Sequence, residues 1–368
     1  MSYYSDHDKY GDFFNSYSPN KQQRLSNGGR QSSKKPKRRL KAWVKAAIAV
    51  IVLGILVLVT VLSVFKFKGS DSPEGKASDI TPSDSASVVN TLPGRSVARP
   101  VSADYTVTLG NNIESKNAIL MDTSNGTILA RRNADERIYP ASMTKVMTLL
   151  TVAEHIDDIT ATFKMTSAII DPLYKSDLVL AGFGPGEEVK IIDMIYGMVL
   201  KSGAEASVGL AVYISGSEEE FVKLMNQKAS SLGLTDTNFV NVSGKHDKNH
   251  YTTCTEMAMI MHAAIENDFC RQVLSTEYYT VAANSHHEEL KFHSGMFEKM
   301  YGTEPDVATI KGGKTGFTSQ SLFCLVSFAE TDDKRDIICV TAQGEGKYSP
   351  VYDCIKLYKT YTHPRKAE

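Results

Sequence analysis

The chain has 368 residues, of which 42% are hydrophobic and 23% charged, and its net charge at pH 7 is -1. This composition is typical of a globular protein and excludes a largely disordered chain. Residues 1–42 carry ten Lys or Arg against three Asp, and residues 43–66 add two Lys, so the rest of the chain is acidic. An acidic body behind a basic arm argues against nucleic-acid binding by the folded part.

The N-terminal region consists of a polar tail followed by a long apolar segment. Residues 1–42 show little apolar periodicity and are predicted to be a disordered, basic cytoplasmic tail. Residues 46–65 contain no charge, and a helix of that length spans roughly 30 Å, the thickness of a bilayer core. The denser basic cluster lies before this segment, so the positive-inside rule places the N-terminus in the cytoplasm. We therefore expect a transmembrane signal anchor over residues 43–66. A cleaved signal peptide is the alternative, although its apolar region is usually shorter.

Residues 67–110 are rich in Ser, Asp, Pro and Gly and are predicted to be a flexible linker. The folded domain is expected over residues 111–362, outside the cytoplasmic membrane. It opens with a predicted hairpin, in which two short apolar runs at 118–121 and 127–130 flank an Asn-Gly turn signal.

Apolar residues at helical spacing predict helices over 142–156, 191–200, 207–214, 218–232, 255–266 and 351–361. Short β-rich runs at 322–329 and 337–342 predict strands near the end of the chain. Helices in the middle with strands at both ends of the domain predict an α+β fold whose terminal strands come together in one sheet.

The cysteines and histidines do not predict a metal site. No two of the five cysteines have C-x-x-C spacing, and small buried thiols are the expected reading. The run His286-His287-Glu288-Glu289 lacks H-E-x-x-H spacing and is expected to be a loop. We predict neither a metal nor any other cofactor.

A possible nucleophile lies in the segment P-A-S-M-T-K, where Ser142 and Lys145 form an S-x-x-K motif at the start of a predicted helix. Residues i and i+3 share a helix face, so the Lys145 amine can lie beside the Ser142 hydroxyl. A lysine whose pKa is lowered by burial and nearby cations can take the proton of a serine nucleophile. The motif is short, and a serine at this place is otherwise a common N-cap.

Two further motifs follow Ser142 in order along the chain. Lys314-Thr315-Gly316 precedes the predicted strand at 322–329, and a glycine there suits a strand edge that admits a ligand backbone closely. The other motif, Lys201-Ser202-Gly203-Ala204, lies between the S-x-x-K motif and Lys314 in the chain. The third motif strengthens the signal of the S-x-x-K motif, although Ser142 taken by itself is more typical of an N-cap.

With these segments the sequence resembles the low-molecular-weight penicillin-binding proteins of the D-alanyl-D-alanine carboxypeptidase family, which are related to class A β-lactamases. The resemblance covers roughly residues 115–360. It includes the opening hairpin, the segment G-P-G-E-E-V-K-I-I-D-M-I-Y-G-M-V-L-K-S-G and the later F-V-K-L-M-N-Q-K-A-S-S-L-G-L. It implies a β-lactamase/transpeptidase-like fold, with an antiparallel sheet flanked by helices.

The resemblance also implies the role of each site residue in a serine-type D-Ala-D-Ala carboxypeptidase acting on peptidoglycan stem peptides. Ser142 would be acylated, Lys145 would deprotonate it, and Ser202 would relay a proton to the leaving amine. The implied substrate-binding residues are Lys314, Thr315, Gly316 and Phe317. Among them, Lys314 would supply positive charge near Ser202, and Thr315 would bind the terminal carboxylate of the substrate. The backbone N–H groups of Ser142 and Phe317 would form the oxyanion hole. β-Lactam antibiotics would be covalent inhibitors, and the cytoplasmic membrane would be the other partner.

The sequence departs from the family pattern at Ala204, where the second motif commonly has Asn. That amide orients the lysine and the substrate, so either Glu205 or a water takes over its role, or turnover is weakened. Two alternatives to the carboxypeptidase therefore stay open: a catalytically weak penicillin-binding protein that serves as a wall-binding or scaffold protein, and a β-lactamase.

Overall fold

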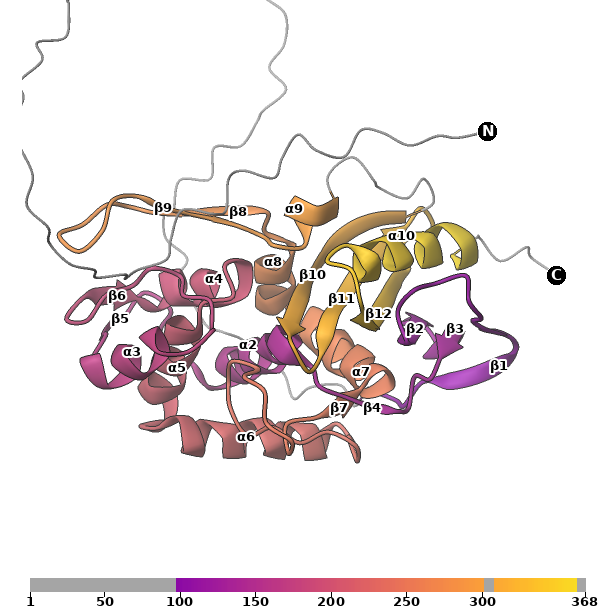
Figure 1. The fold of residues 1–368 in the computed structure, drawn as a ribbon, viewed down its shortest axis with the longest axis horizontal. Coiled ribbons are helices and arrows are strands. Elements are labelled where there is room, and N and C mark those ends of the chain that lie inside the picture. The colour runs from indigo at the N-terminus through magenta and orange to yellow at the C-terminus, as the bar shows by residue number, and fades with distance from the viewer. Residues whose placement is uncertain (1–96, 301–307, 363–368) are drawn as a thin grey trace, which may run out of the picture. The chain divides into compact units, whose positions relative to one another are not determined.

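A computed structural model describes residues 97–300 and 308–362 of the chain. Its centre is a six-stranded sheet (Figure 1) with the strand order β1-β3-β2-β12-β11-β10. The strands are β1 (Val101–Thr108), β2 (Asn117–Asp122), β3 (Thr127–Arg132), β10 (Ala308–Thr318), β11 (Leu322–Thr331) and β12 (Asp336–Gly344). β2 pairs with β12, so the predicted meeting of the domain's two terminal segments in one sheet is confirmed.

The sheet is mixed, not antiparallel as expected, because β1 runs parallel to β3. The hairpin formed by β2 and β3 inserts its second strand between β1 and β2, so β1 and β3 become neighbours that run in the same direction. β1 also lies within residues 67–110, the range expected to be a linker. The paired structure therefore begins before residue 111.

Two apolar layers cover the two faces of the sheet. Successive residues of a strand point to opposite faces, and β12 shows this directly. Ile338 and Val340 pack in the larger core, whereas Ile337 and Cys339 pack in the smaller one. Helix α7 (Cys254–Ile265) packs on the first face and α10 (Ser349–Tyr361) on the second. The nucleophile helix α2 (Thr144–His155) packs against α7 in the larger core.

The remaining helices form a second group beside the sheet (Figure 1). They are α3 (Ser167–Tyr174), α4 (Ile191–Leu200), α5 (Ala204–Ser215), α6 (Glu218–Ser231) and α8 (Asp268–Ser275). Short strands pair as β4 (Arg137–Ile138) with β7 (Thr252–Thr253), β5 (Thr162–Lys164) with β6 (Glu188–Lys190), and β8 (Tyr278–Val281) with β9 (Leu290–His293). A one-turn helix, α9 (Phe297–Met300), lies between β9 and β10 in the chain.

Most predicted elements inside the domain are confirmed with small shifts of their ends. The main difference is at Ser142, where a 3₁₀ turn, η1 (Ala141–Met143), precedes α2. The predicted tail and anchor at 1–66 lie outside the described residues. In the part that is described, no helix combines the length and apolar character needed to span a membrane.

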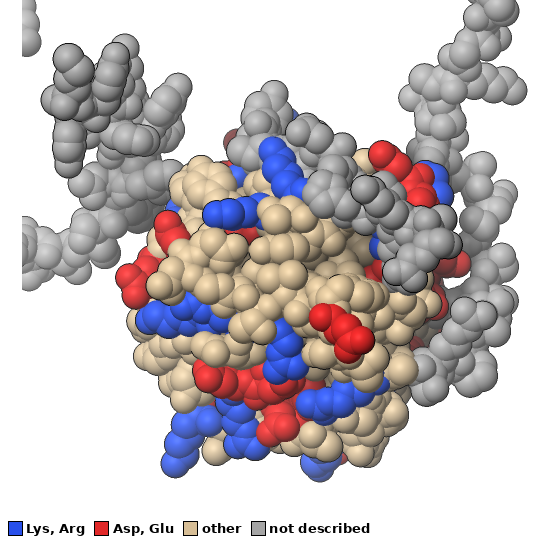
Figure 2. Space-filling view, turned by 90° about the vertical axis from the view of Figure 1, so that its right-hand side faces the viewer, with Lys and Arg blue, Asp and Glu red and all other residues tan. Residues whose placement is uncertain are grey.

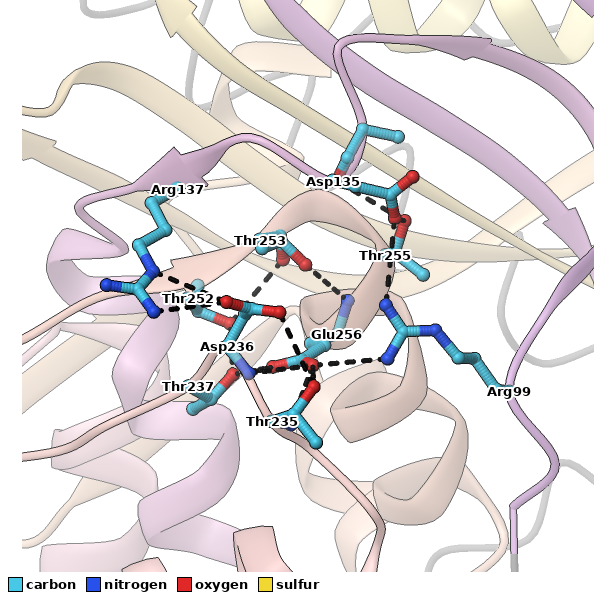
Figure 3. A network of polar contacts seen from close by, with 11 residues as sticks. Arg99, Asp135, Arg137, Thr235, Asp236, Thr237, Thr252, Thr253, Thr255 and Glu256 are labelled. Atoms are coloured by element: carbon cyan, nitrogen blue, oxygen red, sulfur yellow. Dashed lines mark hydrogen bonds and ion pairs between the residues drawn. The ribbon is translucent and has the colours of Figure 1, made fainter.

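A polar network around Glu256 fixes the start of α7 to a neighbouring loop (Figure 3). The buried Glu256 carboxylate accepts hydrogen bonds from the N–H groups of Thr235 (2.9 Å) and Asp236 (3.0 Å) and from the Thr237 hydroxyl (2.6 Å). Arg99 lies 3.5 Å from the same carboxylate. One buried side chain thus satisfies several donors of the loop that would otherwise be unpaired.

The cysteines are all buried and unpaired. His287 lies between β8 and β9, with its Nε2 2.8 Å from Glu187 Oε1. No group of three or more His, Cys, Asp or Glu within 97–300 and 308–362 is arranged to hold a metal. On the face drawn in Figure 2, basic and acidic side chains are interspersed, unlike the continuous basic surface that binds nucleic acid.

Candidate active site

Ser142 and Lys145 lie together where the 3₁₀ turn meets α2. The Lys145 Nζ is 3.3 Å from the Ser142 Oγ, as expected for residues three apart at a helix start. The Lys145 side chain is only 1% exposed, and its Nζ also donates to the Ser243 carbonyl at 2.6 Å. The amine is therefore held in one place, beside the hydroxyl.

Burial lowers the pKa of Lys145 from 10.5 to about 7, and the Glu205 charge opposes this by raising it. An ammonium ion loses its hydration when it is buried, so the neutral amine is favoured. Near neutral pH a substantial fraction of Lys145 is then unprotonated and able to accept a proton. The geometry and the pKa together suit a general base acting on the Ser142 hydroxyl.

Strand β10 brings the third motif against the same turn. A side-chain carbon on Gly316 would lie 3.0 Å from the Ser142 amide nitrogen and 3.0 Å from the Pro140 carbonyl oxygen. Such distances are shorter than ordinary carbon contacts, so glycine allows β10 to approach η1 this closely. β10 is an edge strand of the six-stranded sheet and packs against η1.

The side chains of the third motif differ in exposure. Lys314 is 4% exposed, and its Nζ donates to the Thr315 carbonyl at 3.0 Å. Burial, and then the charges of Lys145 and Lys299, hold the pKa of Lys314 well below its usual value. Thr315 is half-buried, and the exposed Phe317 ring stacks on Phe323 with centroids 4.2 Å apart. The two lysines of the first and third motifs are thus close enough to repel each other.

Ser202 lies in the connection between α4 and α5 with a φ of +67°, a conformation that is unusual for a residue other than glycine. Its Oγ is buried and has no hydrogen-bond partner among the described residues. Strained backbone and unpaired buried hydroxyls are both enriched at functional sites. Both features mark Ser202 as a candidate functional residue of the second motif.

Ala204 is the residue at which the second motif departs from the family pattern. Ala204 is fully buried, and its N–H donates to the Val179 carbonyl at 2.9 Å. The Glu205 carboxylate accepts from the N–H groups of Gly182 (2.8 Å) and Phe183 (3.3 Å). Burial raises the pKa of Glu205. Glu205 thus holds the 182–183 loop through its hydrogen bonds, whereas it influences Lys145 through charge.

One part of the arrangement was missed by the sequence reasoning. The Asn241 Oδ1 accepts hydrogen bonds from the N–H groups of Ser243, Gly244 and Lys245 and so closes a tight turn. The Ser243 carbonyl of this turn holds Lys145. The run N-V-S-G is a local turn signal, but nothing in it indicates a partner 98 residues away in the chain.

Comparisons with known proteins point to one family and one fold. A family model described as D-alanyl-D-alanine carboxypeptidase matches residues 103–345. The chain is 34% identical to the D-alanyl-D-alanine carboxypeptidase DacF of Bacillus subtilis over 243 residues, which are 62% of this chain and 57% of that protein. It is 30% identical to DacC of Escherichia coli, with 62% and 56% covered. The chain thus spans little more than half the length of these relatives.

Solved structures with the same fold include penicillin-binding protein 5 from Haemophilus influenzae, at 27% identity and a TM-score of 0.60, covering 68% of this chain and 72% of that one. The Streptomyces K15 DD-transpeptidase, at 24% identity, gives a TM-score of 0.61 and covers 68% and 98%. The expected transpeptidase-like α+β fold is confirmed, with the mixed sheet described above.

Proposed function

This chain belongs to the D-alanyl-D-alanine carboxypeptidase family, and we propose that it removes the terminal D-alanine from peptidoglycan stem pentapeptides. The observation that carries the proposal is the placement of the buried Lys145 amine 3.3 Å from the Ser142 hydroxyl. The pKa of about 7 for Lys145 supports its role as the base. The packing of β10 against the turn that carries Ser142 supports a single site formed by the first and third motifs.

In the proposed reaction, Ser142 Oγ attacks the carbonyl carbon of the penultimate D-alanine while the neutral Lys145 amine takes the hydroxyl proton. The carbonyl oxygen becomes an oxyanion, which the N–H groups of Ser142 and Phe317 stabilise. The C–N bond then breaks, and the leaving D-alanine amine receives a proton through Ser202. Water attacks the resulting ester, which frees the shortened peptide and restores the Ser142 hydroxyl.

The third motif binds the substrate in this proposal. Lys314 contributes positive potential beside the reacting groups, and the Thr315 hydroxyl donates to the terminal carboxylate of the substrate. Gly316 lets β10 pack closely against η1, so the edge of β10 on which the substrate is held lies beside Ser142. A β-lactam enters the same site and acylates Ser142, because its strained amide takes the place of the scissile peptide bond.

The direct test is the release of D-alanine from a diacyl-Lys-D-Ala-D-Ala peptide by the purified domain. Wild type should release D-alanine, whereas Ser142→Ala should be inactive while unfolding at an unchanged temperature. Folded wild-type protein that leaves the peptide intact would contradict the proposal.

A second candidate function is favoured by one observation, the replacement of the usual Asn by the buried Ala204. A weak penicillin-binding protein would be acylated by penicillin but would hydrolyse the peptide too slowly to matter for the wall, and it would bind wall peptide or a partner instead. Measurable acylation without peptide turnover would select this candidate. Rapid clearance of the penicillin ester would indicate a β-lactamase.

We also propose that residues 43–66 anchor the domain on the outer side of the cytoplasmic membrane. The support is the twenty uncharged residues at 46–65 and the basic cluster before them. The intact mass of protein extracted from membranes should include residues 1–42. A mature N-terminus beyond residue 65 would contradict an uncleaved anchor.

A further inference from the structure

The loop between α3 and β6 is held from two sides by buried carboxylates. On one side Glu205 accepts hydrogen bonds from the N–H groups of Gly182 (2.8 Å) and Phe183 (3.3 Å). On the other side Glu187 accepts from the Gly184 N–H at 2.8 Å. Glu205 is 0% exposed and Glu187 is 1% exposed. The backbone of the loop is therefore fixed for as long as both carboxylates keep their places.

His287, in the hairpin of β8 and β9, holds Glu187 in its place. The His287 Nε2 lies 2.8 Å from the Glu187 Oε1, and the Asn284 Nδ2 donates to the same oxygen at 2.9 Å. The His287 Nδ1 lies 2.6 Å from the Glu288 carbonyl oxygen. Both ring nitrogens thus face acceptors, and only a doubly protonated imidazole donates to both. The geometry is that of a histidinium paired with a buried carboxylate.

Apolar contacts also join the hairpin to the loop. The Phe183 ring packs against the rings of His287 and Phe292, with centroids 6.3 and 6.1 Å apart. A side-chain carbon on Gly182 would lie 3.2 Å from the Leu290 Cδ2, and the φ of this glycine is +122°, which other residues rarely adopt. Because the contacts are close, a displacement of the hairpin tip displaces the loop as well.

The loop in turn reaches the proposed base through Glu205. This residue lies in the first turn of α5, and its charge acts on Lys145. The Glu205 Oε2 is buried and has no hydrogen-bond partner among the described residues. The N–H groups of the loop, which bind the other oxygen, therefore help to fix where this negative charge lies.

We propose that His287 is a positioning residue of the active site. Through Glu187 it fixes the loop between α3 and β6, and this loop fixes the Glu205 carboxylate near Lys145. The inference rests on the proposed function for the role of Lys145, and it deepens that function. His287 lies outside the three sequence motifs, and its part in the reaction is to hold the charge that acts on the base.

The test is a double-mutant cycle on the pH dependence of acylation by a labelled penicillin between pH 5 and 8. Glu205→Gln removes the charge and should move the acid limb of the rate profile to lower pH. His287→Gln leaves Glu187 buried without its cation, so the loop loosens and water screens the Glu205 charge. The limb should then already lie at lower pH, and adding Glu205→Gln should move it by less than about half of its effect in wild type.

Exchange of amide hydrogens supplies a readout that does not depend on activity. The N–H groups of the loop that donate to the two carboxylates should exchange at least about tenfold faster in His287→Gln and in Glu187→Gln. The turn at 241–245 should exchange as in wild type. His286→Gln is the matched control, because His286 is an exposed histidine of the same hairpin, and it should change neither the exchange nor the acid limb.

Thermal unfolding of each variant shows whether the fold is kept, and Glu187→Gln replaces His287→Gln in the cycle if the latter does not fold. A full, additive effect of Glu205→Gln in the His287→Gln background would overturn the inference while leaving the carboxypeptidase reaction in place. Unchanged exchange of the loop in folded His287→Gln would overturn it as well. Wild-type protein that penicillin does not acylate would instead contradict the proposed function, and with it the role of Lys145 on which the inference rests.

Discussion

The rate of acylation should depend on pH through Lys145. Only the neutral amine can take the Ser142 proton, and burial lowers the pKa of this amine to about 7. The acylation rate should therefore rise with pH up to about 7 and then become constant. For a single group with this pKa, about half of the protein is reactive at pH 7 and about one hundredth at pH 5, which is roughly a fifty-fold difference in rate.

Glu205→Gln separates the charge of Glu205 from its hydrogen bonds. The amide oxygen can still accept from the Gly182 and Phe183 N–H groups. The negative charge is removed, and this charge raises the pKa of Lys145. The pKa of Lys145 should then fall further, so the acid limb of the rate profile should move to lower pH.

The assay is the second-order rate constant for acylation by a labelled penicillin between pH 5 and 8. Circular dichroism at each pH shows that the protein stays folded, and Glu219→Gln, on the exposed face of α6, is the control. A rate that does not change between pH 5 and 7 would refute Lys145 as the base. A limb that moves to higher pH in Glu205→Gln would refute the assigned direction of the Glu205 effect.

Three further predictions concern stability and packing. The pKa of Lys145 falls from 10.5 to about 7 on folding, so between these two pH values the unfolded chain binds more protons than the folded one. As the pH rises from about 7 to 10.5, the free energy of unfolding should therefore increase by on the order of 3–5 kcal/mol. Urea titrations should show this increase in wild type and its loss in Lys145→Met. Gly316→Ala places a carbon 3.0 Å from the Ser142 amide, so acylation should fall more than tenfold, and an unchanged rate would show that β10 can move away without cost. Glu256→Ala leaves the Thr235 and Asp236 N–H groups without their acceptor and should lower the unfolding free energy by about 2–4 kcal/mol. A negligible loss in denaturant unfolding would contradict this prediction.

The predictable parts of the fold are those encoded by local patterns. The hairpin around residues 123–126 follows from two apolar runs and a turn signal, and the helix at 191–200 follows from its apolar run. The pairing of Ser142 with Lys145 follows from helical spacing, with the reservation that the serine lies in a 3₁₀ turn and not in the helix itself.

The parts that could not be predicted depend on contacts between distant segments. The parallel pairing of β1 with β3 is decided by where the β2–β3 hairpin folds. Residues 101–108 contain the Val, Thr and Tyr favoured in strands, but nothing in them indicates which strand they pair with. The turn at 241–245 holds Lys145 through a backbone carbonyl, which leaves no trace in residue type.

The central claim is that Ser142 is the nucleophile. Its most direct test is mass spectrometry of purified residues 67–368 after treatment with penicillin. One added penicillin mass is expected on the peptide that contains Ser142, and no adduct is expected in Ser142→Ala. An adduct on another residue, or folded protein that takes up no penicillin, would contradict it.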